Sequence, residues 1–194
     1  MNNKPTGPTW VLDPLDGTSI FLLGIPLYAC IIAFVNDSKV QFGLVLDLLN
    51  REIFTARPAL GAFLGDELLD TNSNNSDFIG VSSGFLEKVA IEQPHLIVQL
   101  RDVGKFRLLG SQALHLCYVA SGRMKACVNL ESKIWDDIAG ALILQEANGT
   151  YSTITVFYPD RVNSVDPSQS LFSLGKAEKK AKLDKIIRRQ NIEE

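Results

Sequence analysis

An uncharged stretch near the start of the chain constrains its fold more than any other feature. It covers residues 17–36, is mostly apolar, and approaches the roughly 20 residues that a membrane helix needs. A membrane helix is one interpretation, but Gly24 and Pro26 interrupt the stretch. A tight turn followed by a buried strand at 27–35 explains it better, because a strand covered on both faces is continuously apolar. The sequence therefore predicts a sheet with cover on both sides.

The rest of the chain predicts mixed α/β structure. Residues 40–47 and 51–56 predict two more strands, so the first half is expected to form an antiparallel meander. The polar loop at 70–77 divides the chain into residues 1–77 and 78–194, which are expected to form one compact unit. After this loop we expect strands at 79–82, 96–100, 124–129 and 171–174, and helices at 85–92, 111–121, 136–147 and 177–189.

Composition excludes several classes of function. A hydrophobic content of 46% over 194 residues is typical of a folded domain. The net charge of −3 argues against a general nucleic-acid binder, and the polar first residues do not predict a signal peptide. Cys30, Cys117 and Cys127 are expected to be buried thiols in a reducing compartment, which predicts a cytoplasmic protein. His115 is expected to pack inside the fold.

Candidate metal-binding and catalytic residues concentrate at positions 10–21, which have the sequence WVLDPLDGTSIF. Asp13 and Asp16 follow a short apolar strand and can converge on one hard cation, and ligation by oxygen alone favours Mg²⁺. Gly17 lets the backbone approach an anion, and Thr18 adds a hydroxyl group. The alternative is an ordinary turn, in which the aspartates and the glycine only stabilise the backbone conformation and bind no ligand.

A second cluster, Trp135–Asp136, lies at the start of a predicted helix, where an aspartate can also be an ordinary cap. Together the two clusters resemble the inositol monophosphatase family of Mg²⁺-dependent, lithium-sensitive phosphatases. The family pattern W-x-x-D-P-x-D-G-T-x-x-F matches residues 10–21 without a gap, and a W-D motif on a helix ending in E-A-x-G matches 135–149. Gly61–Ala62–Phe63 resembles the family's G-A-F turn. The resemblance spans essentially the whole chain and implies an αβαβα sandwich.

The resemblance also implies a metal centre. Asp13, Asp16 and Asp136 would bind Mg²⁺ at two or three sites, with Asp16 bridging two ions and the Leu15 carbonyl as a further ligand. Thr18 would contact the activated water, so Thr18 and Asp16 are the catalytic candidates. The implied reaction is in-line attack of that water on a phosphate monoester, with a second ion stabilising the leaving alkoxide.

Phosphate and substrate contacts follow from the same resemblance. Gly17 and Thr18 would hold phosphate through their N–H groups, and Ser19 is a further candidate. Gly110–Ser111 resembles the family's helix start on the substrate side. Asn129 stands where the inositol-type enzymes have a sugar-binding glutamate, so it is the candidate on the substrate side and inositol phosphate itself is not implied. Glu131 is nearby but out of register.

Two departures from the family pattern affect the metal centre. Family members carry a segment ahead of the first motif, with two helices, an acid that partners the threonine and a metal-binding glutamate in G-E-E; in this chain that segment would precede Met1. Three carboxylates would then face two Mg²⁺ ions, so weak metal binding and little or no turnover are expected. The W-D helix reads Asp136–Asp137; Trp135 and Gly140 favour Asp136 as the ligand, with Asp137 as the alternative.

Three functions remain open at this point. The first is a phosphatase acting on a small sugar or polyol phosphate. The second is a non-catalytic protein that binds metal or phosphate or serves as a partner subunit, and the third is a nucleotide 3′-phosphate phosphatase. A small phosphorylated metabolite is the expected partner, without nucleic acid or membrane. Because the strand at 27–35 is apolar on both faces, we also expect association through an uncovered sheet face, as a homodimer or with a separate fragment.

Overall fold

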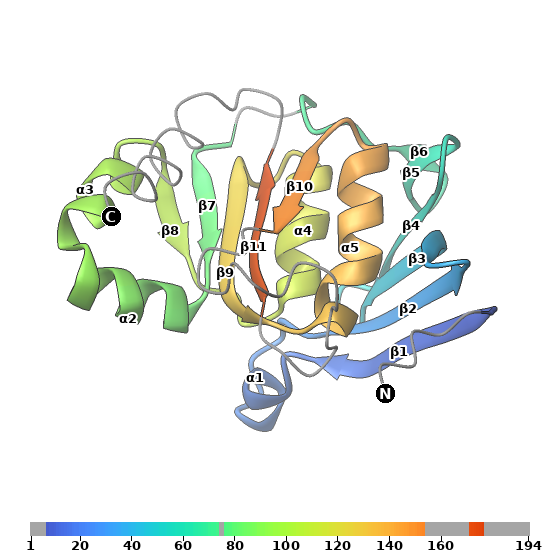
Figure 1. Cartoon of the computed structure of the whole chain (residues 1–194), viewed down its shortest axis with the longest axis horizontal. Helices are drawn as coiled ribbons and strands as arrows, with labels where there is room; N and C mark the ends of the chain where they lie inside the picture. Colours follow the sequence, from blue (N-terminus) through green and yellow to red (C-terminus); the bar gives the residue numbers. More distant parts are fainter. Residues whose placement is uncertain (1–6, 74–75, 154–170, 177–194) are drawn as a thin grey trace.

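The chain folds into alternating layers of sheet and helix (Figure 1). The computed structural model describes residues 7–73, 76–153 and 171–176. Two helices lie between two sheets, and two more helices lie on the far side of the second sheet. This arrangement confirms the predicted α/β layered sandwich.

The first sheet has six strands in the order β1-β2-β3-β4-β5-β6, and each neighbouring pair is antiparallel. Its strands are β1 (Thr9–Asp16), β2 (Ala29–Asn36), β3 (Lys39–Asp47), β4 (Glu52–Arg57), β5 (Gly61–Leu64) and β6 (Glu67–Leu68). Asp37 and Ser38, which join β2 to β3, both have positive φ, as the tightest two-residue hairpin turn requires. Short turns of this kind produce the predicted meander.

The second sheet has five strands in the order β10-β11-β9-β7-β8. Strand β7 pairs in parallel with both β8 and β9, whereas β11 pairs antiparallel with β9 and β10. The strands are β7 (Phe78–Val81), β8 (Lys105–Arg107), β9 (Ala126–Ser132), β10 (Thr150–Thr153) and β11 (Leu171–Lys176). The two sheets fall on either side of residue 77, although the predicted division into domains stays a prediction.

Five helices connect or cover these sheets in the described part of the chain. They are α1 (Thr18–Leu22), α2 (Ser83–Glu92), α3 (Pro94–Arg101), α4 (Gln112–Ala120) and α5 (Ile134–Glu146). Helices α4 and α5 fill the space between the sheets, and α2 and α3 cover the other face of the second sheet. Side chains of Ser82 and Ser111 cap α2 and α4 by accepting hydrogen bonds from Phe85 N and Leu114 N.

The main apolar core lies where α4 and α5 meet the first sheet. Ile31, Val45 and Phe54 project from β2, β3 and β4 and are fully buried against these helices. A smaller core lies between the second sheet and α2 and α3, around Ile79 and Leu100. Burying α4 and α5 on both sides fixes their first turns beside the end of β1, where Asp13 and Asp16 lie.

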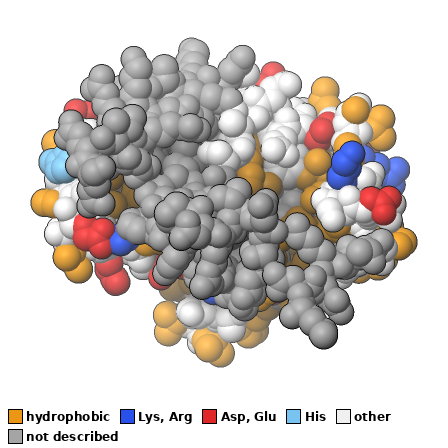
Figure 2. Space-filling model, viewed as in Figure 1, with side chains coloured by type: hydrophobic (Ala, Val, Ile, Leu, Met, Phe, Trp, Pro, Cys, Tyr) orange, Lys and Arg blue, Asp and Glu red, His pale blue; other side chains and the backbone are white. Residues whose placement is uncertain are grey.

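The opposite face of the first sheet is apolar and exposed. Its outward side chains include Trp10 and Leu12 on β1 and Ile53 on β4, which are 64%, 59% and 46% exposed. No described helix packs on this face, so the described part has one helix layer fewer than the predicted αβαβα order. Exposed apolar side chains also gather at the lower edge of the molecule, where α1 lies (Figure 2).

Most predicted elements are confirmed, but the strand predicted at 96–100 is wrong. These residues belong to α3, in which Leu96 and Leu100 are buried one helical turn apart while Val98 is 65% exposed. A short apolar run fits both the two-residue repeat of a strand and the 3.6-residue repeat of a helix. Pro94 in the first turn favours the helix. The predicted helix at 177–189 lies outside the described residues. None of the helices within 7–73, 76–153 and 171–176 has the length and apolar character needed to cross a bilayer.

Candidate metal centre

An irregularity at the end of β1 brings the first two acidic residues together. Side chains three positions apart on a regular strand point to opposite faces of the sheet. The register of β1 on β2 shifts between Asp13 and Asp16, which changes the direction of the second side chain. Leu15 N donates to Asp13 Oδ1 at 3.0 Å, so this bulge also orients the first carboxylate.

A tight turn then leads from β1 into α1. Gly17 has a φ of 91°, and a Cβ at this position would lie 3.0 Å from the carbonyl oxygen of Leu27. Glycine is therefore required both by the backbone conformation and by the close approach. The Thr18 hydroxyl donates to the Leu15 carbonyl at 2.9 Å, which closes the turn. The predicted group Leu15, Gly17 and Thr18 thus lies directly beside Asp16.

The N-terminus of α4 holds Asp16. This carboxylate is 8% exposed, and its Oδ2 accepts hydrogen bonds from Ser111 Oγ at 2.7 Å and from Ala113 N at 2.9 Å. A helix N-terminus presents free N–H groups and a partial positive charge, which suits a buried carboxylate. The β8–α4 connection comes close to α1, because a Cβ at Gly110 would overlap the Ile20 side chain.

Helix α5 supplies the third carboxylate. Asp136 lies in its first turn, and its Oδ2 accepts from the backbone N–H of Lys133 at 2.7 Å. One carboxylate oxygen from each of Asp13, Asp16 and Asp136 lies within 4.8 Å of the others. The structure therefore brings together the three predicted metal ligands from β1 and α5, although they are far apart in the sequence.

The donor set fits a hard divalent cation. Each of the three carboxylates uses one oxygen to accept a protein hydrogen bond, from Leu15 N, from Ser111 and Ala113, or from Lys133 N. These hydrogen bonds orient the three carboxylates, so the ligands are held in place before an ion binds. Three oxygen donors without nitrogen or sulfur suit Mg²⁺ or Mn²⁺ better than zinc or copper.

Burial and mutual repulsion disturb the ionisation of these carboxylates. Burial raises the pKa of Asp16 to about 7, opposed by the hydrogen bonds from Ser111 and Ala113 and reinforced by the charges of Asp136 and Asp13. Burial also raises the pKa of Asp136 to about 6, with further contributions from Asp13 and Asp137. Carboxylates so placed are stabilised in their charged form by a bound cation.

The alternative ligand, Asp137, belongs to a different set of contacts. It is 2% exposed and accepts hydrogen bonds from Gln112 Nε2 at 2.8 Å and from Ser132 Oγ at 2.7 Å. The cluster of acidic residues includes Asp136 and not Asp137. The geometry thus favours Asp136 as the ligand, in agreement with the sequence-based assignment.

The remaining predicted site residues are placed in different ways. Ser19 is exposed on α1, beside Thr18. Asn129 is 7% exposed; its Nδ2 donates to Gln112 Oε1, and its Oδ1 accepts from the N–H groups of Glu131 and Ser132. Both ends of its amide are therefore engaged within the protein, and its predicted contact with substrate stays a prediction. Glu131 accepts from Gly84 N at the start of α2.

Three supporting groups were missed from the sequence: Ala113 N, Lys133 N and the Gln112 side chain. Two of these are backbone donors, which carry no signature in the amino-acid type. Ser111 could be recognised as a helix cap from its place before an apolar helix. Its bond to Asp16, however, joins residues 95 positions apart and depends on the packing of α4 against the first sheet.

Comparisons with known proteins agree with this geometry. A model of the inositol monophosphatase family matches residues 1–187. The "Nus factor SuhB" of Pasteurella multocida is 36% identical over 155 residues, covering 77% of this chain and 58% of the relative. The "Inositol-1-monophosphatase" of Mycobacterium bovis is 39% identical over 150 residues, covering 72% of this chain and 51% of the relative. The chain thus spans little more than half the length of these curated relatives.

Solved structures show the same architecture. Mycobacterium tuberculosis SuhB superposes with a TM-score of 0.76 at 31% identity, covering 94% of this chain and 72% of that one. The inositol monophosphatase from Anabaena gives a TM-score of 0.77 over 97% of this chain at 21% identity, which supports the fold. The family match over residues 1–187, together with the acidic cluster, shows that this chain belongs to the inositol monophosphatase family.

Proposed function

We propose that this protein is a Mg²⁺-dependent phosphate monoester hydrolase that acts on a small sugar or polyol phosphate. The observation that carries the proposal is the cluster of Asp13, Asp16 and Asp136, with oxygens within 4.8 Å of one another beside a glycine turn. Family membership supports the same chemistry. The substrate class rests on the sequence resemblance alone.

The three carboxylates would hold the cation, and the Leu15 carbonyl is the proposed fourth protein ligand. When bound, Mg²⁺ would supply Lewis-acid polarisation of the phosphoryl group and activation of water. The protein's own part is to orient the ligands: Ser111 and Ala113 hold Asp16, and the Lys133 N–H holds Asp136. The hydroxyl of Thr18, fixed by its bond to Leu15 O, is the proposed contact of the reacting water.

The phosphate would lie over the turn from β1 into α1. The N–H groups of Gly17, Thr18 and Ser19 precede the first bonds of this helix, in which Ile20 N and Phe21 N are the donors to the Gly17 carbonyl. Groups at this position have no acceptor within the helix and can hold an anion. Gly110, Ser111 and Asn129 remain the proposed residues on the substrate side.

The proposed setting is the cytoplasm. Cys117 and Cys127 are buried free thiols as expected, whereas Cys30 is a free thiol that is partly exposed, and burial raises the pKa of Cys117 well above its ordinary value. Buried free thiols favour a reducing compartment. The proposed partner in that compartment is a small phosphorylated metabolite.

The test is phosphate release from a panel of inositol, polyol, sugar and nucleoside 3′-phosphates, with and without Mg²⁺. We expect slow, Mg²⁺-dependent and lithium-sensitive release from a polyol or sugar phosphate, and none from the Asp16→Asn variant. Phosphate release confined to the nucleoside 3′-phosphate would instead support a nucleotide 3′-phosphate phosphatase. Metal binding without any release, even at high protein concentration, would contradict the hydrolase and favour a non-catalytic binding protein.

A further inference from the structure

A buried carboxylate lies one residue beyond the metal centre. Asp137 is only 2% exposed and accepts hydrogen bonds from Gln112 Nε2 at 2.8 Å and from Ser132 Oγ at 2.7 Å. Burial raises the pKa of Tyr151 on β10, and the nearby charge of Asp137 raises it further. This one side chain of α5 is thus hydrogen-bonded to α4 and to β9. Burying a carboxylate costs desolvation free energy even when it is hydrogen-bonded. A structural or functional role is therefore expected for Asp137.

Two backbone N–H groups determine the orientation of the Asn129 and Gln112 side-chain amides. Asn129 Oδ1 accepts from the N–H groups of Glu131 and Ser132, so its Nδ2 must face Gln112. Gln112 Oε1 accepts from that Nδ2, which turns Gln112 Nε2 toward residue 137. An acceptor is therefore needed at this position, because an apolar side chain would leave the buried amide of Gln112 without its bond to α5.

The bond between Gln112 and Asp137 connects the two helix turns that hold the metal ligands. Gln112 lies between Ser111 and Ala113, which both donate to Asp16. Asp137 directly follows Asp136 in the first turn of α5. The separation between Asp16 and Asp136 thus depends on how closely these two turns approach each other.

A second contact holds the same helices about one turn further along. A Cβ at Gly140 would lie 2.9 Å from the Cβ of Leu116, so α4 and α5 are in close contact there. Apolar packing of this kind holds the two helices together along their length. The hydrogen bond from Gln112 to Asp137 adds a directional polar contact at their first turns, where the metal ligands lie.

We propose that Asp137 is a positioning residue for the metal centre, because through Gln112 it holds the first turn of α4 against the first turn of α5. Asp16 and Asp136 are thereby kept at a separation that suits one cation. This inference rests on the proposed metal-dependent function. It predicts that the hydrogen bonds of Asp137, more than its charge, determine metal affinity.

The test is Mn²⁺ binding by calorimetry to the full chain and its variants. Asp137→Ala removes the acceptor and should weaken Mn²⁺ binding at least tenfold. Asp137→Asn should restore the affinity to within about threefold of the parent, because its oxygen can accept from Gln112 and its amide can donate to the Ser132 hydroxyl. Asp47→Ala is the matched control, since Asp47 is also a fully buried, hydrogen-bonded carboxylate but lies outside the cluster. Its Mn²⁺ affinity should equal that of the parent.

Two results would overturn the proposal. One is parent-like binding by a folded Asp137→Ala variant, and the other is equally weak binding by Asp137→Asn and Asp137→Ala, which would assign the effect to charge. If Asp137→Ala does not fold, Gln112→Met decides, because it breaks the same link and keeps the carboxylate; parent-like binding by this variant also overturns the proposal. Failure of the metal centre itself is distinguishable, because Asp16→Asn would then bind Mn²⁺ as tightly as the parent.

Discussion

Asp16 combines two functions that are normally separate, since it is both a buried structural acceptor and a candidate metal ligand. Its Oδ2 accepts from Ser111 and Ala113, and the same carboxylate belongs to the acidic cluster with Asp13 and Asp136. An amide at this position can keep the accepted bonds but lacks the charge that a cation needs. The Asp16→Asn variant should therefore fold and should lose at least tenfold in Mn²⁺ affinity, or about 1.4 kcal/mol or more.

Calorimetry with Mn²⁺ measures this loss. Asp66→Asn is the matched control, because Asp66 is an exposed aspartate outside the cluster. Its affinity should not change. An unchanged affinity in Asp16→Asn would show that this carboxylate is not a ligand.

Protons compete with the cation at the same carboxylates. Burial raises the pKa of Asp16 to about 7 and that of Asp136 to about 6, so in the metal-free protein both groups bind protons at mildly acidic pH. A cation must displace these protons, and its affinity should therefore rise with pH across this interval and level off above it. Calorimetry in buffers of different ionisation enthalpy should show proton release near pH 6 and much less at pH 8. A pH-independent affinity would contradict this expectation.

The buried side chain of His115 should make the stability of the fold depend on pH. Its imidazole is 2% exposed, Nε2 accepts from Leu109 N, and Nδ1 has no hydrogen-bond partner among the described residues. Burial lowers its pKa from 6.5 to about 4, so between these values the unfolded chain binds the proton and the folded chain does not. Stability is therefore fully present above pH 6.5 and is lost as the pH falls toward 4, by about 3 kcal/mol.

Urea unfolding at several pH values measures this effect. The parent should lose more stability than His115→Gln as the pH falls from 6.5 to 4.5, even if the variant is less stable at pH 7. The comparison removes the contribution of the carboxylates, which titrate in both proteins. Parallel curves for the two proteins would exclude His115 as the cause.

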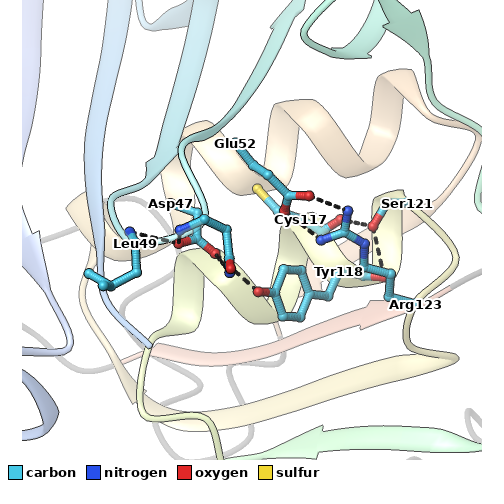
Figure 3. Close-up of polar contacts among 8 residues, drawn as sticks. Asp47, Leu49, Glu52, Cys117, Tyr118, Ser121 and Arg123 are labelled. Carbon is cyan, nitrogen blue, oxygen red and sulfur yellow. Dashed lines mark hydrogen bonds and ion pairs between the residues drawn. The ribbon is translucent and has the colours of Figure 1, made fainter. Parts of the chain in front are cut away.

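At the scale of elements, a polar cluster joins the β3–β4 hairpin to α4 (Figure 3). Asp47 at the end of β3 is fully buried and accepts from Leu49 N, from both the N–H and the side-chain amide of Asn50, and from the Tyr118 hydroxyl. Beside it, Arg123 forms two hydrogen bonds with Glu52 on β4, at 2.6 and 2.7 Å. The cluster thus connects the first sheet to the helix that holds Asp16.

Removing the Asp47 acceptor should destabilise the protein without affecting metal. Asp47→Ala leaves several buried donors without partners and should lower the free energy of unfolding by about 3 kcal/mol. Asp47→Asn should cost less, because its oxygen still accepts from the turn and the Tyr118 hydroxyl can reverse its role. Urea unfolding measures both variants. Equal losses in the two variants would show that the charge of Asp47, rather than its accepted hydrogen bonds, stabilises the hairpin.

At the scale of the whole molecule, the outer face of the first sheet is apolar and is not covered by any described helix. A six-stranded sheet is about 24 Å wide, and this face presents Trp10, Leu12 and Ile53 to solvent. Such a face has an area on the order of 500 Å², which approaches one partner's share of a stable interface. We propose that the isolated chain self-associates through it, with a second copy as the covering partner.

Light scattering over a range of concentrations tests the association. Ile53→Lys places a charge in the middle of the face and should weaken association, whereas Ile91→Lys, at an 82% exposed position on α2, should not. A parent chain that stays monomeric at tens of micromolar and does not bind a hydrophobic dye would refute the proposal. Equal effects of the two substitutions would assign the association to another surface.

Local sequence patterns determined much of this protein. The meander of β2, β3 and β4, the helices α4 and α5, and the acidic motif around Gly17 were all predicted, because each depends on residues close together in the chain. The family resemblance added Asp136 to the metal centre. These features required no knowledge of how the elements pack.

Only the tertiary structure decided the rest. The run at 96–100 became a helix because Leu96 and Leu100 pack on the second sheet, a contact that the short run cannot specify. Asp136 and Asp137 are both acidic and adjacent, yet one joins the cluster and the other contacts Gln112 and Ser132. Their separation depends on which face of α5 meets α4, because successive helical side chains point in different directions. Contacts between distant residues are set by packing, and no local pattern encodes them.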